Sequence, residues 1–244
     1  MSHVINKDKR YRSFIKEDFF KSYQVKASET DLYIRTDSNL SDLALASVLK
    51  HRNSIEEYIR NKPDFLSALT PLEEDSRAPE IIRQMLKFSK EAQVGPMASV
   101  AGAIAEFVGH DLSKHSANAI VENGGDVFIK TNQSIRVGIF AADSPLSLKI
   151  AIRVLPDETP MGICTSSATV GHSLSFGIAD AVCVTSKSAI LADAAATFIG
   201  NKVKGKEDIK KAIEEGLNIK GVRGVIIIVG DAMRVAGDIK IEGR

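Results

Sequence analysis

The first quarter of the chain changes from an alternating to a helical pattern of apolar positions. Residues 11–37 contain alternating, β-branched and aromatic stretches, which are typical of strands in an antiparallel sheet. Between Leu40 and Lys62 the apolar residues recur at intervals of three and four, which predicts a long amphipathic helix. Ser38 is the expected N-cap of this helix, and Pro63 is its expected end.

Shorter elements of both kinds follow. The pattern predicts an amphipathic helix over residues 80–90 and a second helix, rich in small residues, after Val94. An Asn-Gly turn divides residues 119–130 into two strands, and two further strands are predicted over 134–141 and 148–155. Because these strands follow one another without a regular helix between them, we expect an antiparallel α+β fold rather than a doubly wound sheet.

A short internal repeat suggests how these elements are organised. The segments Ala101–Gly109 and Ala192–Gly200 are identical at five of nine positions, and a pair of predicted strands follows each of them. We therefore predict a duplicated fold, in which residues 1–244 form one domain. Its two halves, each a helix with an antiparallel sheet, would span roughly residues 1–150 and 151–244.

Composition and charge exclude several classes of function. The net charge of +1 over 244 residues gives no reason to expect nucleic acid as a partner. No apolar run approaches the roughly 20 residues of a membrane span, and the N-terminal sequence lacks the apolar core of a secretory signal. Two cysteines are too few for a disulfide framework. We accordingly predict a cytoplasmic protein without a membrane partner.

Asp193 and Thr197 are the first candidate for chemistry, because residues at i and i+4 share one face of a helix. A carboxylate and a hydroxyl are hard oxygen ligands, of the type that suits Mg²⁺ with waters and ligand phosphates completing its shell. The alternative is a packing role, with Asp193 near the positive end of its helix and Thr197 bonded to a backbone carbonyl. The repeat has Gly102 and Glu106 at the equivalent positions, so the shared scaffold does not require the Asp–Thr pair.

A second candidate is the segment Gly162–Val184, which is rich in hydroxyl groups and glycine and carries a single charge. Such a segment can bind a phosphate or a planar ring through its hydroxyls and backbone N–H groups, although a polar loop is the simpler interpretation. Its candidate ligand-binding residues are Thr165, Ser166, Ser167 and Ser173. His172 lies among them and is a candidate general acid or base, with a structural role as the alternative.

The segment Glu122–Phe128 places two glycines between carboxylates. A hairpin turn is sufficient to explain it, but Gly124 and Gly125 would also let a ligand approach the backbone closely. Asp126, directly after the turn, is a second candidate base. Cys164 and Cys183 are expected to be small buried apolar residues rather than nucleophiles.

Taken together, these motifs resemble the ApbE-like superfamily, whose best-known members are FAD:protein FMN transferases. The matching stretches are Asn123–Asp126, Thr165–Ser167 and Ala192–Thr197. Longer signatures, among them Val94–Glu106 and Gly162–Val182, are similar to a branch of the superfamily without an assigned activity.

The resemblance implies a duplicated fold related to the T-fold, with FAD or FMN in a central cleft. It implies that Mg²⁺ is held by Asp193, Thr197 and a backbone carbonyl, and that Gly124, Gly125 and Asp126 approach the ligand. Glu106 stands where the transferases carry a lysine, and the Asp-Pro-x-Thr-Gly that follows their histidine is absent after His172.

Two functions remain open at this point. In the first, the chain binds a phosphate-bearing ligand such as a flavin nucleotide with Mg²⁺, and FMN transfer or cleavage of a pyrophosphate or phosphoester bond is the candidate reaction. Alternatively, it is a non-catalytic ligand-binding or assembly protein that kept the fold and lost transferase chemistry. A homodimer is a candidate assembly that no sequence feature tests.

Overall fold

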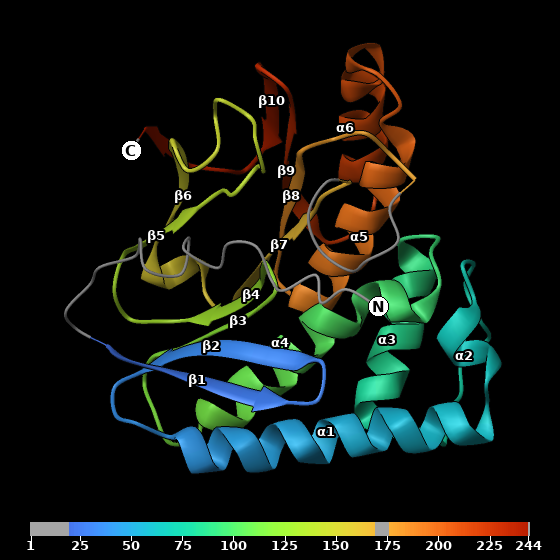
Figure 1. Cartoon of the computed structure of the whole chain (residues 1–244), viewed down its shortest axis with the longest axis vertical. Helices are drawn as coiled ribbons and strands as arrows, with labels where there is room; N and C mark the ends of the chain where they lie inside the picture. Colours follow the sequence, from blue (N-terminus) through green and yellow to red (C-terminus); the bar gives the residue numbers. More distant parts are fainter. Residues whose placement is uncertain (1–19, 169–175, 244) are drawn as a thin grey trace, which may run out of the picture.

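The computed structural model describes residues 20–168 and 176–243, and its centre is an eight-stranded sheet (Figure 1). The strands lie in the order β1-β2-β3-β4-β7-β8-β9-β10, and every neighbouring pair is antiparallel. Their bounds are β1 Lys21–Ala27, β2 Thr30–Thr36, β3 Ala119–Asn123, β4 Asp126–Lys130, β7 Met161–Ser166, β8 Ala181–Ser186, β9 Val222–Val229 and β10 Ala232–Gly237. The predicted antiparallel α+β class is confirmed.

The central strands of this sheet are buried on both faces, and alternate side chains of each strand point to opposite faces. Val121 and Phe128 belong to the core formed with the helices, whereas their neighbours Ile120 and Ile129 pack with a small second sheet. The second sheet comprises β5 Ile135–Gly138, β6 Ile150–Val154 and β11 Ile241–Gly243. The helices are α1 Ser41–Asn61, α2 Asp64–Ser67, α3 Glu80–Glu91, α4 Val100–Leu112, α5 Ala189–Lys202 and α6 Ile209–Leu217, with the 3₁₀ turns η2 Pro96–Ser99, η3 Pro156–Glu158 and η4 Lys206–Asp208.

The order of elements along the chain is similar for the two sets of four strands that form the sheet. A hairpin, one or more helices and a second hairpin supply β1–β4, and the same order supplies β7–β10. The two sets join through the pairing of β4 with β7, for example Phe128 opposite Gly162. The division into halves at residue 150 stays a prediction. No helix of the described residues is both long and apolar enough to cross a bilayer.

The start of α1 differs from the prediction. The N-cap position is Leu40 rather than Ser38, and no side chain caps the helix there. Instead, Asn39 Oδ1 accepts a hydrogen bond from the Ser41 N–H at 2.9 Å, one residue further along. The predicted end is confirmed, since α1 stops at Asn61, before Pro63.

Helix α5 lies against the sheet where β7 has a glycine. A Cβ on Gly162 would lie 2.3 Å from the Ala189 Cα, at the first residue of α5. Real Cβ atoms do not approach backbone so closely, so any side chain at this position would push the helix off the sheet. The close packing of α5 on β7 therefore depends on the missing side chain.

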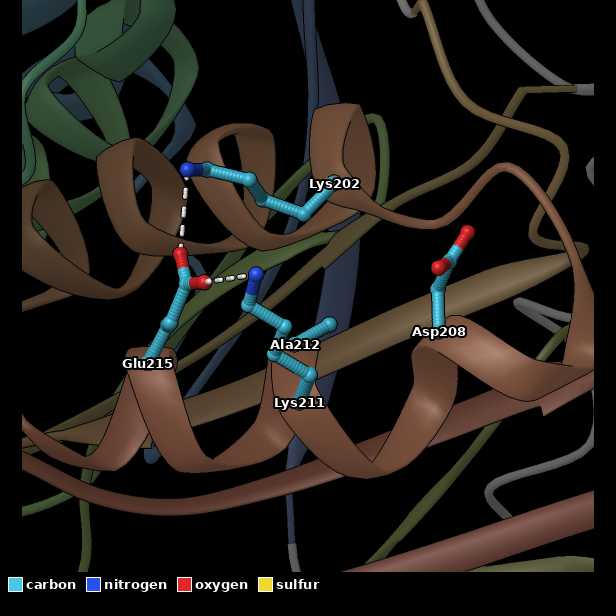
Figure 2. A pocket seen from close by; sticks show the side chains of 5 residues that line it. All are labelled: Lys202, Asp208, Lys211, Ala212 and Glu215. Atoms are coloured by element: carbon cyan, nitrogen blue, oxygen red, sulfur yellow. Dashed lines mark ion pairs between the residues drawn. The ribbon is translucent and has the colours of Figure 1, made fainter.

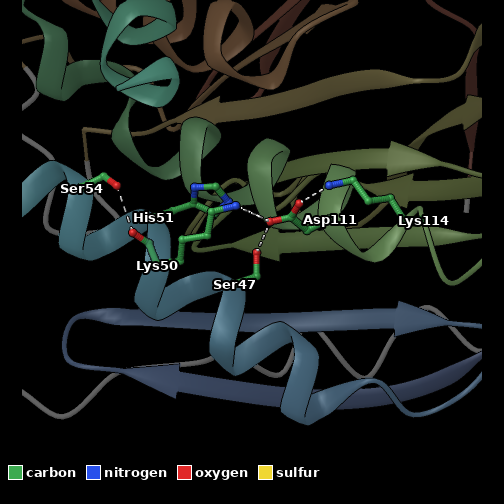
Figure 3. A network of polar contacts seen from close by, with 6 residues as sticks. All are labelled: Ser47, Lys50, His51, Ser54, Asp111 and Lys114. Carbon is green, nitrogen blue, oxygen red and sulfur yellow. Dashed lines mark hydrogen bonds and ion pairs between the residues drawn. The ribbon is translucent and has the colours of Figure 1, made fainter. Parts of the chain in front are cut away.

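Helix α1 is joined to α4 by a polar network around Asp111 (Figure 3). Asp111 Oδ2 accepts a hydrogen bond from Ser47 Oγ at 2.9 Å and lies 3.0 Å from His51 Nε2, while Lys114 Nζ donates to Oδ1 at 2.7 Å. An anion near the C-terminus of α4 is unfavourable with the helix dipole, so these donors offset its cost. Although burial opposes it, hydrogen bonds from Lys114, His51 and Ser47 hold the pKa of Asp111 well below its usual range. Burial lowers the pKa of His51.

We expect Gly162→Ala to lower the free energy of unfolding by roughly 1–3 kcal/mol, because the new methyl group overlaps the α5 backbone. The matched control is Gly138→Ala in β5, where the nearest atom to a Cβ is the flexible Leu148 side chain at 3.7 Å. Urea unfolding of both variants measures the difference. Equal midpoints for the two variants would contradict this account of the α5–β7 contact.

The contribution of His51 to the stability of the protein should fall as the pH decreases below about 6.5, the ordinary pKa of histidine. The pKa of His51 is lowered in the folded chain, so the unfolded chain binds more protons in this range and acid favours unfolding. Between about pH 7.5 and about pH 5.5, the change in the free energy of unfolding, measured with urea, should be less favourable for the native chain than for His51→Gln, which does not titrate at this position. Equal losses would show that His51 does not control this dependence.

Candidate functional site

The first turn of α4, the N-terminal half of α5, the β3–β4 turn and the end of β7 meet, and several of the predicted site residues lie there. The Gly102 N–H donates a hydrogen bond to Asp193 Oδ2 at 2.9 Å, which joins α4 to α5. Asn123 Nδ2 donates to the Ala101 carbonyl at 3.1 Å, which joins the β3–β4 turn to α4. Segments separated by up to 91 positions are thereby held together.

The two helices cross in direct backbone contact at Gly102. A Cβ at this position would lie 2.4 Å from the Ala189 carbonyl oxygen and 2.9 Å from the Asp193 Cβ. Only glycine fits between them, and the close approach allows the Asp193 carboxylate to reach the N-terminal amides of α4. The internal repeat gains a physical meaning here, because Gly102 and Asp193 are equivalent positions that contact each other.

Each of the two helices supplies a carboxylate to the N-terminus of the other, an arrangement that we call the reciprocal caps. Asp193 of α5 accepts from the Gly102 N–H in the first turn of α4. Glu106 of α4 accepts from Ser188 Oγ at 2.8 Å and from the Ile190 N–H at 3.2 Å, at the start of α5. Both carboxylates lie at the positive ends of helix dipoles, where an anion is stabilised.

The reciprocal caps were missed by sequence reasoning. The packing alternative placed Asp193 near the positive end of its own helix, whereas it caps the neighbouring helix α4. Glu106 stands where the transferases carry a lysine, and sequence reasoning did not predict that its carboxylate would bind the N-terminus of α5. The repeat contained the one available signal, since it pairs Gly102 with Asp193 and so aligns the two helices in register.

Asp126 lies beside Asp193, and the two carboxyl groups influence each other. Burial raises the pKa of Asp193 to about 7, against the effect of hydrogen bonds from the α4 backbone. Burial, and next the nearby Asp193, raise the pKa of Asp126 well above its usual range, although hydrogen bonds from Cys164 and the Thr165 backbone oppose this. The charge of Asp193 thus adds to burial in disfavouring ionisation of Asp126.

The β3–β4 turn next to Asp126 consists of two glycines in the left-handed region, with φ of +67° at Gly124 and +114° at Gly125. Gly124 is exposed, and a Cβ on it would meet no atom within 4 Å. The Gly125 N–H donates to Glu122 Oε1 at 3.0 Å, and the site where its Cβ would stand is 3.7 Å from the Thr165 carbonyl oxygen. The turn is thus open on its outer side and faces the end of β7 on its inner side.

The remaining predicted ligand-binding residues have different placements. Thr165 and Ser166 are the last two residues of β7 and are half-buried, and Ser167 follows them. Ser166 Oγ lies 3.4 Å from the site where a Cβ of Gly200 would stand, two turns along α5 from Asp193. His172 and Ser173 lie outside the described residues, so their predicted roles stay predictions.

Thr197 lies one helical turn after Asp193 and is half-buried. Within the described part of the chain its hydroxyl makes no hydrogen bond, so the predicted alternative, a bond to a backbone carbonyl, is not found. No group of three or more His, Cys, Asp or Glu side chains with the geometry of a metal cage occurs among residues 20–168 and 176–243. The oxygen donors here suit a cation that also takes waters and ligand phosphates, as Mg²⁺ does.

The two cysteines are buried, as expected. Cys164 Sγ donates to the Ala189 carbonyl at 3.2 Å, which adds a contact between β7 and α5. Burial raises the pKa of the Cys164 thiol well above its usual range and that of Cys183 to about 12. Both groups are therefore thiols at neutral pH and are poor nucleophiles.

A separate depression of about 120 Å³ lies between the C-terminal end of α5 and α6 (Figure 2). It is lined by Lys202, Asp208, Lys211, Ala212 and Glu215. Glu215 is paired with both lysines: its Oε2 lies 3.0 Å from Lys202 Nζ, and its Oε1 lies 3.9 Å from Lys211 Nζ. Asp208 accepts hydrogen bonds from the backbone of Lys204 and Gly205. We assign this depression no ligand.

The family model described as AbpE bacteria matches residues 12–239. A UPF0280 protein from Methanococcus aeolicus is 40% identical over 222 residues, which cover 88% of this chain and 90% of the relative. A UPF0280 protein from Methanothermobacter thermautotrophicus is 41% identical over 217 residues, which cover 86% and 83% respectively.

Two solved structures share the fold at low sequence identity. The flavinyl transferase ApbE from Pseudomonas stutzeri has a TM-score of 0.56 and 13% identity, and the match covers 89% of this chain and 94% of that one. An ApbE protein from Thermotoga maritima has a TM-score of 0.58 and 13% identity, covering 88% and 96%. At this identity the likeness concerns the fold alone.

The equivalent repeat positions Glu106 and Thr197 should differ in their effect on stability. Glu106→Ala removes the acceptor for the Ile190 N–H and the Ser188 hydroxyl, and we expect it to lower the free energy of unfolding by roughly 1–2 kcal/mol. Thr197→Val, its matched control, removes only a hydroxyl without a bond in the described structure and should change stability by less than about 0.5 kcal/mol. Urea unfolding decides, and similar losses in the two variants would refute the asymmetry.

Proposed function

We propose that this chain, which belongs to the ApbE-like family described as AbpE bacteria, binds a phosphate-bearing small molecule together with Mg²⁺. Asp193 and Thr197 are the proposed protein ligands of the cation. A flavin nucleotide, FAD or FMN, is the first ligand to test, because the P. stutzeri protein that shares the fold is a flavinyl transferase.

The observation that carries the proposal is the gathering of oxygen donors around Asp193. The fold brings the Asp126 and Asp193 carboxyls near each other from different elements. The Thr197 hydroxyl, which makes no hydrogen bond to the described residues, lies one turn away on the Asp193 face of α5. No lysine or arginine of the described residues forms an ion pair with either carboxyl, so no side chain there neutralises them. Such a donor set suits a hard divalent cation, and through it a phosphate.

Other parts of the site would contact the ligand directly. The open Gly124–Gly125 turn offers backbone that a ligand can approach closely, and Thr165, Ser166 and Ser167 offer hydroxyl groups at the adjoining end of β7. When bound, the cation would polarise a phosphate oxygen as a Lewis acid. His172 and Asp126 are the proposed acid–base groups if the protein is an enzyme, with FMN transfer or cleavage of a pyrophosphate or phosphoester bond as the proposed reaction.

The proposal includes the wider setting of this site. The ligand would lie in a central cleft between residues 1–150 and 151–244 of a duplicated domain related to the T-fold. We propose a cytoplasmic location and no nucleic-acid or membrane partner, with a homodimer as the assembly to test.

A non-catalytic ligand-binding or assembly protein is the second candidate, and Glu106 favours it. Its carboxylate is engaged by Ser188 and Ile190 at the start of α5. As a carboxylate, Glu106 supplies no positive charge to a ligand phosphate, unlike the lysine that the transferases carry at this position. In this alternative the site binds its ligand without converting it, so analysis of the bound ligand for products separates the two functions.

The test is calorimetric titration of the protein with FAD in the presence and absence of Mg²⁺. We expect micromolar binding that requires Mg²⁺ and that Asp193→Asn weakens at least about tenfold. Asparagine keeps an oxygen that can accept from the Gly102 N–H, so this variant removes the charge while it preserves the cap.

The matched control is Asp37→Asn, which also removes one hydrogen-bonded carboxylate. Asp37 accepts from Ser116 and Asn118 near the start of β3, whereas the site lies at the end of that strand. Its affinity for FAD should equal that of the native chain. Failure of the native chain to bind FAD with Mg²⁺ would refute the flavin proposal, and equal binding by Asp193→Asn would refute the cation site.

A further inference from the structure

We infer that Asn123 is a positioning residue, which holds the β3–β4 turn against the first turn of α4 and so sets the spacing of the Mg²⁺–phosphate site. This inference rests on the proposed function. Asn123 would act through its side-chain contact with α4. In this arrangement it supplies no ligand to the cation or the phosphate.

Asn123 lies at the β3 end of the Gly124–Gly125 turn. It is the last residue of β3 and pairs directly with Asp126, the first residue of β4, across the Gly124–Gly125 turn. Two glycines with positive φ join these residues, so the turn has no side chains of its own to hold it in place. A displacement of Asn123 would therefore move Asp126 with it.

The side chain of Asn123 is hydrogen-bonded to α4. Its Nδ2 donates at 3.1 Å to the carbonyl of Ala101, which lies in the first turn of α4. The next residue, Gly102, donates its N–H to Asp193. Consecutive backbone groups of one helical turn thus hold the Asn123 amide and the Asp193 carboxylate.

The consequence concerns the spacing of the two acidic groups. Asp126 is tied to Asn123 by strand pairing, and Asp193 is tied to Gly102 by its cap, while the Asn123–Ala101 bond connects these two units. A cation and a phosphate need fixed distances between the α5 carboxylate and the turn, and displacements near 1 Å are costly in such sites. Asn123 is placed to supply that constraint.

The sequence alone does not distinguish this role from that of a turn residue. Asparagine is common in tight hairpin turns because it tolerates their backbone angles, and in Asn-Gly-Gly the side chain needs no further function. A merely structural Asn123 would affect folding stability, whereas a positioning residue would affect ligand affinity with little change in stability. The experiment uses this difference.

Three variants of the full chain are titrated with FAD and Mg²⁺ and followed by thermal unfolding and by hydrogen exchange of the peptide that covers η2 and the start of α4. Asn123→Ala removes the donor, and Asn123→Asp keeps the shape but sets a carboxylate oxygen against the Ala101 carbonyl. Asn61→Ala is the matched control, since Asn61 Nδ2 also donates to a helix carbonyl, that of Glu57, at 3.1 Å, at the exposed C-terminal end of α1.

We expect about a tenfold loss of FAD affinity in Asn123→Ala and a larger loss in Asn123→Asp, which corresponds to at least about 1.4 kcal/mol. In both Asn123 variants, hydrogen exchange at the start of α4 should become faster, while the melting temperature should stay within about 2 °C of the native value. Asn61→Ala should match the native chain in affinity and in exchange at α4.

The outcomes distinguish a failure of the positioning role from a failure of the proposed function. If the native chain binds FAD with Mg²⁺ and Asn123→Ala binds equally well, the positioning role is refuted while the proposed function stands. If the Asn123 variants lose FAD affinity and their melting temperature also falls by clearly more than about 2 °C, Asn123 is a structural residue and the inference is also refuted. If the native chain does not bind FAD with Mg²⁺, the proposed function fails, and this inference fails with it.

Discussion

The first residue of α5, Ala189, is enclosed on two sides by backbone, and the rest of the structure around the site depends on this contact. A Cβ on Gly102 of α4 or on Gly162 of β7 would lie within 2.4 Å of Ala189 backbone atoms. Helix α5 is therefore wedged between another helix and the sheet, with no side chain between the three. Protein interiors are close-packed and transmit small displacements, so the separations of α4, α5 and β7 are set together.

This close approach explains why the polar groups of the site have their positions. Because the helices touch, a short aspartate on α5 reaches the first turn of α4, and a longer glutamate on α4 reaches the start of α5. The N-termini of both helices are thereby capped by carboxyl groups from outside their own chain segment. In the proposed function, one of these capping groups, Asp193, also holds the cation, so the packing of the helices and the chemistry of the site share a residue.

The sequence supports different features to different degrees. Periodicity identified helices α1, α3 and α4 and strands β3 to β6, because burial of one helix stripe or one strand face is a local property of the pattern, but it did not predict α2 or α6. The start of α1 was wrong, since Asn39 forms the local backbone bond that Ser38 was expected to supply near the N-cap. The partners of Asp193 and Glu106 were not predictable, because each lies on a different helix more than 80 positions away.

The sequence by itself determined the antiparallel α+β class, the family resemblance and the set of polar residues that could bind a ligand, because these follow from patterns within short segments. The tertiary structure decided which of those residues meet. It placed Asp126 beside Asp193, made Asp193 and Glu106 reciprocal caps and left the Thr197 hydroxyl without a bond in the described residues. The physical reason is that two glycines let three backbones approach one another, and the effect of a missing side chain depends on what lies opposite to it.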